Sequence, residues 1–331
     1  MGNTYKELGK LNEATQCYSM AIKLNPKFAD AYGNLGAVYK DTGNHKLAIQ
    51  AYTNALKLNP NFCDAYCNLA HSQRMICQWS DYNEQLLKIH QIIRDQLTKR
   101  KTQHSLGQNP ALWVPSVHPH HTMLYPTIDL PMALEISTCH AEMAQQKIIG
   151  HLLNTGAHSV TSRDTGKTIV QEKYIQFYLK SIRQVTKFVD SETGIILRKL
   201  RIGFMSSDFG NHPTSHLTRS IFGEVSKSKN CEAYCYALSP DDGTLFRRQI
   251  KIECTKMVDL AGLSAVDMAE LVSDDKIDIL VNMNGYTKGA MTEVFALRPA
   301  PIQVMWLGYP GGSGARYSRF YILWPVLKAV F

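Results

Sequence analysis

The chain has 331 residues, of which 44% are hydrophobic and 19% are charged, and its 36 Lys and Arg residues exceed its 28 Asp and Glu residues by a net charge of +8. This balance provides enough apolar side chains for two or three domains and excludes wholesale disorder. The basic surplus is spread along the chain and its densest run covers only residues 99–101, so the sequence does not favour nucleic-acid binding.

The eight cysteines include no Cys-x-x-Cys pair, and the chain is too long for a scaffold held together by disulfides. Both features favour a reducing compartment. No apolar run reaches the ~18 residues of a membrane helix, and residues 1–24 lack the apolar core of a signal peptide. We therefore expect a soluble protein that does not bind a membrane.

Residues of the same type recur 34 positions apart in the first third of the chain. This period, with small residues at fixed helical positions, is the signature of tetratricopeptide repeats, in which helix pairs stack into a solenoid. Gly36, Ala48 and Ala55 are small where two helices approach closely, and Pro60 ends the second helix because it lacks an N–H group. We assign residues 1–77 to these repeats. The matching pairs are Gly9/Gly43, Ala14/Ala48, Tyr18/Tyr52, Ala21/Ala55, Pro26/Pro60, Asp30/Asp64, Tyr32/Tyr66 and Leu35/Leu69.

Asn34 and Asn68 occupy the same position in successive repeats. Repeats of this kind bind peptides on a concave face, and an asparagine there can both donate to and accept from an extended backbone. The alternative is that both residues are ordinary polar positions on a helix surface. The repeat pattern alone leaves both interpretations open.

Residues 78–100 carry an apolar stripe that predicts a long helix. The polar, proline-punctuated residues 101–116 have the composition of a linker. Residues 78–117 are therefore expected to form a terminal helix and a connection to a second folded region.

From residue 200 onward, short apolar runs alternate with helix-like stretches. This alternation predicts a doubly wound parallel sheet, a Rossmann-like fold whose ligands bind at the carboxyl ends of the strands. Neither Gly-x-Gly-x-x-Gly after the first strand nor Gly-x-x-x-x-Gly-Lys-Ser/Thr occurs, which disfavours dinucleotide oxidoreductases and P-loop NTPases. The predicted strands are residues 200–205, 233–238, 277–283 and 302–307, and the predicted helices are 214–226, 245–252, 264–273 and 290–297.

Polar residues at the predicted strand ends and in a histidine-rich segment are candidates for chemistry. An extended His118-x-His120 pair would present two imidazoles on one face, so a metal site with Asp208, His212 or His216 is one interpretation. The same histidines could form a wall without metal or serve a structural role. His120, Asp208 and His212 are candidates for acid–base work, but their spacing does not assign the roles.

Several long segments carry a resemblance to a known family, namely residues 118–126, 206–217, 235–244, 280–289, 295–303 and 306–311. After the repeats, the sequence resembles the protein O-GlcNAc transferases. These are two-lobed GT-B glycosyltransferases of the nucleus and cytoplasm. They transfer N-acetylglucosamine from UDP-GlcNAc to Ser or Thr of proteins with inversion, without a metal or another cofactor.

The resemblance implies a role for individual residues. His120 would lie beside the sugar, His212 near the reacting groups, and Asp208 is a candidate for handling the proton, with the identity of the base left open. Asn34 and Asn68 would belong to an asparagine ladder that grips Ser/Thr-containing protein substrates along the concave face. The sugar and acceptor pocket would be lined by Pro213, Thr214, Leu307 and Gly308.

The sequence departs from the family pattern near its end. Residues 118–314 correspond to the N-terminal catalytic lobe, whereas residues 315–331 form a divergent tail where the family continues into a second lobe. Because that lobe supplies most contacts to the uridine and diphosphate in the family, the chain alone is expected to be inactive. The alternative function is a non-catalytic peptide-binding module or truncated isoform.

Overall fold

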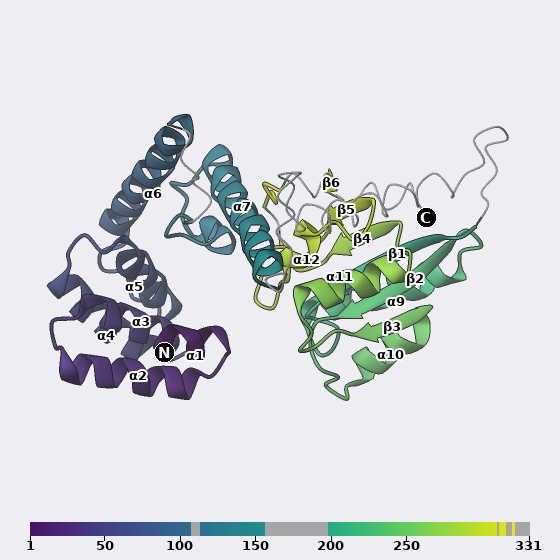
Figure 1. Cartoon of the computed structure of the whole chain (residues 1–331), viewed down its shortest axis with the longest axis horizontal. Helices are drawn as coiled ribbons and strands as arrows, with labels where there is room; N and C mark the ends of the chain where they lie inside the picture. Colours follow the sequence, from purple (N-terminus) through teal and green to yellow (C-terminus); the bar gives the residue numbers. More distant parts are fainter. Residues whose placement is uncertain (107–112, 156–197, 310, 316–319, 322–331) are drawn as a thin grey trace, which may run out of the picture. The chain divides into compact units, whose positions relative to one another are not determined.

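A computed structural model describes residues 1–106, 113–155, 198–309, 311–315 and 320–321. By its internal contacts the chain divides into two units, residues 1–110 with 115–132 and residues 111–114 with 133–331. Figure 1 shows a helical first unit and a second unit built on a sheet. Within the described residues, no helix is long and apolar enough to cross a membrane.

Antiparallel helix pairs form the first unit, as the 34-residue period predicts. Ala48 and Ala55 are fully buried, and a Cβ atom added to Gly36 would lie 2.8 Å from the ring of Tyr52. Small residues at these positions therefore allow the close helix approach that defines the repeat. The helices are α1 (Gly2–Glu7), α2 (Leu11–Leu24), α3 (Ala29–Asp41), α4 (His45–Leu58), α5 (Cys63–Met75) and α6 (Tyr82–Ser105).

The segment after the repeats differs from its expected organisation. Helix α6 continues to Ser105, so residues 101–105 are helical and the expected linker over 101–116 is wrong at its start. Residues 115–132 pack with the helical unit, where His90 Nδ1 lies 2.8 Å from the carbonyl oxygen of Thr127 and Gln96 donates to Ser116 Oγ. Residues 115–132 thus belong to the helical unit because they pack against α6.

A parallel sheet forms the centre of the second unit, with strand order β3-β2-β1-β4-β5-β6. Every pairing between neighbouring strands is parallel. The four predicted strands are all present, and the sequence did not predict β3, β6 or helix α7. The strands are β1 (Leu200–Ser206), β2 (Cys231–Ala237), β3 (Lys256–Asp259), β4 (Ile279–Asn282), β5 (Ile302–Met305) and β6 (Phe320–Tyr321), and the helices are α7 (Leu130–Thr155), α9 (Pro213–Lys227), α10 (Leu245–Glu253), α11 (Ala265–Asp274) and α12 (Thr292–Ala296).

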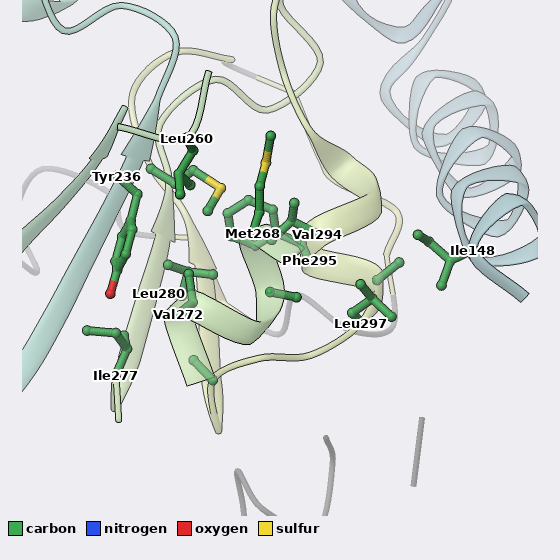
Figure 2. Close-up of a cluster of buried hydrophobic side chains, with 14 of the residues drawn as sticks. Ile148, Tyr236, Leu260, Met268, Val272, Ile277, Leu280, Val294, Phe295 and Leu297 are labelled. Atoms are coloured by element: carbon green, nitrogen blue, oxygen red, sulfur yellow. The ribbon is translucent and has the colours of Figure 1, made fainter. Parts of the chain in front are cut away.

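Apolar layers cover both faces of this sheet, because successive side chains of a strand point to opposite faces. Met205 packs with residues of α11 and α12, whereas its neighbour Phe204 packs with Phe222 of α9 and Ile250 of α10. Figure 2 shows the first layer, which Ile148 of α7 also joins. Helices on both faces make the sheet doubly wound, as predicted.

Candidate active site at the carboxyl edge of the sheet

The segment from the end of β1 into the first turn of α9 carries four of the nine predicted site residues, Asp208, His212, Pro213 and Thr214. Ser206 Oγ accepts the N–H of Asp208 at 3.0 Å, and the hydroxyl of Ser215 donates to the carbonyl oxygen of Asp208. His212 is the N-cap of α9, where its Nδ1 atom accepts the N–H of Thr214 at 3.3 Å. Pro213 occupies the first helical position, which suits a residue without an N–H group.

The turn brings Asp208 and His212 together. His212 Nδ1 lies 3.6 Å from Asp208 Oδ2, with side chains 49% and 14% exposed. An imidazole can accept a proton, and a neighbouring carboxylate stabilises the cation that results. The structure therefore places these two side chains next to each other.

A second loop holds the turn from the β2 side. Asp242 accepts the N–H of Asn211 at 2.8 Å and the hydroxyl of Thr244 at 2.8 Å. Desolvation acts to raise the pKa of Asp242, but these hydrogen bonds and the charge of Arg247 lower it below its usual value. Arg247 is 2% exposed and donates to the carbonyl oxygens of Phe209 at 2.9 Å and Ser239 at 3.3 Å.

Sequence reasoning did not assign Asp242 or Arg247 to the site. The run Asp241-Asp242-Gly243-Thr244 before a predicted helix is a signal for a capped N-terminus, and Thr244 is indeed the N-cap of α10. Nothing in the local sequence shows that Arg247 would be buried against a loop 38 residues earlier.

The predicted pocket residues Leu307 and Gly308 follow β5. Leu307 has a left-handed backbone with φ 75°, and its side chain is 40% exposed. A Cβ atom on Gly308 would collide with the carbonyl oxygen of Met283 and lie 3.1 Å from Asn284 Cα. Gly308 therefore lies directly against the end of β4, which is the neighbour of β1 in the sheet.

His120 belongs to the helical unit, whereas Asp208 and His212 belong to the α/β unit. The expected extended His-x-His pair is wrong, because Pro119–Leu124 form a 3-10 helix in which His118 Nδ1 accepts the N–H of His120. His121 stacks on His71 at 4.1 Å between ring centroids. In the part of the chain that the structure describes, no group of three or more His, Cys, Asp or Glu side chains could hold a metal ion.

The two asparagines of the repeats lie on the first helix of successive pairs, Asn34 in α3 and Asn68 in α5. Asn68 Oδ1 accepts from Lys40 Nζ at 2.7 Å, and its Nδ2 donates to the carbonyl oxygen of Asp64 at 2.9 Å. Burial lowers the pKa of Lys40. A carboxamide offers two N–H groups and two lone pairs, so the described contacts leave Asn68 one of each for a ligand.

The fold defines a tetratricopeptide-repeat region followed by a Rossmann-like α/β domain. Models of tetratricopeptide repeats match residues 2–43 and 29–62. The model of glycosyl transferase family 41 matches residues 76–176 and 162–327. The chain therefore belongs to glycosyltransferase family 41.

Relatives with assigned activities are similar over most of this chain. It is 45% identical over 250 residues to a UDP-N-acetylglucosamine–peptide N-acetylglucosaminyltransferase of Caenorhabditis elegans, covering 75% of this chain and 18% of the relative. It is 39% identical over 255 residues to a probable enzyme of the same name from Arabidopsis thaliana, covering 77% and 22%. The chain thus spans about a fifth of the length of these relatives. A solved Thermobaculum terrenum O-GlcNAc transferase mutant matches 97% of this chain and 51% of its own at 18% identity, with a TM-score of 0.49.

Proposed function

We propose that this chain contributes to a protein O-GlcNAc transferase, in which N-acetylglucosamine passes from UDP-GlcNAc to Ser or Thr of a protein with inversion. The observation that carries the proposal is the 3.6 Å approach of His212 to Asp208 at the carboxyl edge of the sheet, in a chain of glycosyltransferase family 41. Both the edge and the residue types suit the transfer of a group to a hydroxyl.

The chemistry requires that the acceptor hydroxyl lose its proton as its oxygen bonds to the anomeric carbon and UDP leaves. His212, Asp208 and His120 are the candidate proton acceptors, and only the first two are paired within one unit. We assign Pro213, Thr214, Leu307 and Gly308 to the sugar and acceptor pocket. UDP-GlcNAc is the proposed donor, and we propose no metal and no further cofactor.

For the repeats we propose binding of Ser/Thr-containing proteins along the concave face, through the backbone of the substrate. The free N–H group and lone pair of Asn68 support this proposal. Binding of an unstructured Ser/Thr peptide to the chain is expected to weaken about tenfold in the Asn34→Ala/Asn68→Ala double variant, because two bidentate contacts are lost. The exposed Lys57→Ala variant is the control. Unchanged affinity in the double variant contradicts this role.

Transfer is tested in a chimera in which this chain replaces the matching 250 residues of the Caenorhabditis elegans relative. We expect transfer of labelled sugar from UDP-GlcNAc to a Ser peptide, loss of it in His212→Ala, and retention in the surface control Lys227→Ala. The isolated chain is expected to bind peptide without turnover. A folded chimera that binds peptide but never transfers sugar would favour the non-catalytic module instead.

The resemblance also supports a location in the nucleus and cytoplasm. Fluorescence microscopy of the tagged chain tests this assignment, and retention of the protein in a secretory compartment would contradict it.

A further inference from the structure

The side chain of Asn284 lies at the end of β4, beside the turn that carries Asp208. It is 1% exposed, and the pairing of Met205 with Asn282 places it next to Ser207. Its Oδ1 atom accepts the N–H of Ser207 at 2.8 Å. Its Nδ2 atom lies 3.1 Å from Asp208 Oδ2 and 2.8 Å from Ser207 Oγ.

The chain around Asn284 fixes this carboxamide in place. Asn282 Oδ1 accepts the N–H groups of both Asn284 and Gly285, at 3.0 and 2.8 Å, so the strand ends in a tight turn. Gly285 adopts φ 60°, a left-handed conformation that favours glycine. Gly308 packs against the backbone of Asn284 from the neighbouring strand end. The amide therefore has little freedom to rotate away from the β1 turn.

Both oxygens of the Asp208 carboxylate thus accept a hydrogen bond. Oδ1 accepts from Ser207 Oγ at 2.8 Å, and Oδ2 accepts from Asn284 Nδ2. The same Oδ2 atom is the one that faces His212. We infer that Asn284 is a positioning residue, which aims the carboxylate of Asp208 at His212 for the sugar transfer.

The chemistry of the site explains why a carboxamide is needed. One atom must accept a backbone N–H group while another donates to a carboxylate, and of the ordinary side chains of this size only asparagine does both at neutral pH. In the structure His212 Nδ1 accepts from Thr214, so an imidazolium with a proton on Nδ1 needs another acceptor. Asp208 Oδ2, held by Asn284, is placed to be that acceptor.

This inference rests on the proposed function for the importance of Asp208, so two independent readouts test it. The first uses the 331-residue chain and needs no activity. In Asn284→Ala we expect amide exchange at Ser207 to rise about tenfold while Phe204 and Met205 in β1 stay protected. A crystal structure of this variant is expected to show the Asp208 carboxylate turned away from His212.

The second readout is steady-state kinetics in the chimera. Asn284→Ala is expected to lower kcat by about tenfold or more, with the KM values for donor and peptide within about twofold. Asn284→Asp keeps the shape, and its protonated form restores both a donor and an acceptor, so its kcat relative to the parent should rise as the pH falls. Thr287→Val, which removes another contact of Nδ2, should leave kcat within about twofold of the parent.

The outcomes distinguish failure of the proposed function from failure of the positioning role of Asn284. If the parent chimera transfers no sugar, the proposed function fails, and exchange at Ser207 together with the position of Asp208 still decides the inference. An unmoved Asp208 in Asn284→Ala, or loss of protection throughout β1 and β4, overturns the inference in favour of a purely structural role. An unchanged kcat in Asn284→Ala also overturns it, even where the chimera is fully active.

Discussion

His212 Nδ1 lies 3.6 Å from Asp208 Oδ2 across the turn between β1 and α9, beyond hydrogen-bond distance. The same nitrogen accepts the N–H of Thr214. One imidazole thus caps the helix and faces a carboxylate. The two tasks can be separated by mutation, because asparagine can cap a helix but cannot accept a proton as an imidazole does.

Substitution of His212 should separate stability from chemistry. His212→Ala removes the helix cap and is expected to lower the free energy of unfolding by about 1 kcal/mol, whereas asparagine is a good N-cap and should cost only a few tenths. Both variants are expected to lose sugar transfer in the chimera. Urea unfolding of the chain measures the first effect, and equal destabilisation by both variants would contradict the capping role.

Arg247 should be important for the stability of the α/β unit. Its buried guanidinium donates to the carbonyl oxygens of Phe209 and Ser239, which Arg247→Leu would leave without these donors. We expect a loss of about 2–3 kcal/mol in the free energy of unfolding. Arg247→Lys should recover only part of this, because one ammonium does not reproduce the planar fork. If the Arg247→Leu variant and the parent chain unfold at the same urea concentration, this role is refuted.

Gly308→Ala and Leu307→Gly, at adjacent pocket positions, should change the free energy of unfolding with opposite signs. A Cβ atom on Gly308 meets the backbone of Met283 and Asn284, so Gly308→Ala is expected to lower the free energy of unfolding by about 1–3 kcal/mol. Leu307 has a left-handed backbone with φ 75°. Leu307→Gly relieves the strain of this conformation and is expected to raise the free energy of unfolding by about 1 kcal/mol. Thermal melts of both variants check the signs, and a Gly308→Ala chain as stable as the parent contradicts the first.

Acid should destabilise the helical unit. Burial, together with the positive charges of Lys40 and Arg74, lowers the pKa of His71 to about 4, and burial beside His71 lowers that of His121 to about 3. The unfolded chain binds these protons near pH 6.5. Above that pH the histidines are neutral in both states, and the free energy of unfolding is not reduced by their protonation. It falls by up to about 1.4 kcal/mol per pH unit for a fully buried histidine as the pH drops toward 4.

Denaturant titrations between pH 7 and 4 measure this dependence. Because His71 is 9% exposed, we expect the neutral variant His71→Gln to reduce the slope by up to about one proton. Lys57→Ala on the exposed surface serves as the control. An unchanged slope in His71→Gln would contradict the neutral, buried state of this ring.

The repeats and most strands could be predicted because their signals are local and periodic. A spacing of 34 residues indicates which helix faces meet. The repeat position of Gly36 is therefore enough to predict that it lies where two helices approach closely. The run of residues 233–238 is apolar on both faces because helices cover the sheet on both sides. By contrast, β3 is a four-residue strand whose ends are exposed, so its sequence has no continuous apolar run.

The site was only partly predictable, for a physical reason. Asp208 and His212 are four residues apart and meet within one turn, so a strand end and a helix start suffice to place them together. Asn284 approaches Asp208 from 76 residues away, and only the order β1-β4 in the sheet brings it there. An extended backbone for His118 to His120 was wrong because Pro119 begins a 3-10 helix.

The most direct measurement is the rate of sugar transfer from UDP-GlcNAc by the chimera with Asp208→Asn and with His212→Asn, each compared with the parent. We expect kcat to fall by about 100-fold or more in each variant, while the KM values for donor and peptide and the fold stay unchanged. Transfer at the parental rate by both variants would contradict the assignment of this pair to the active site.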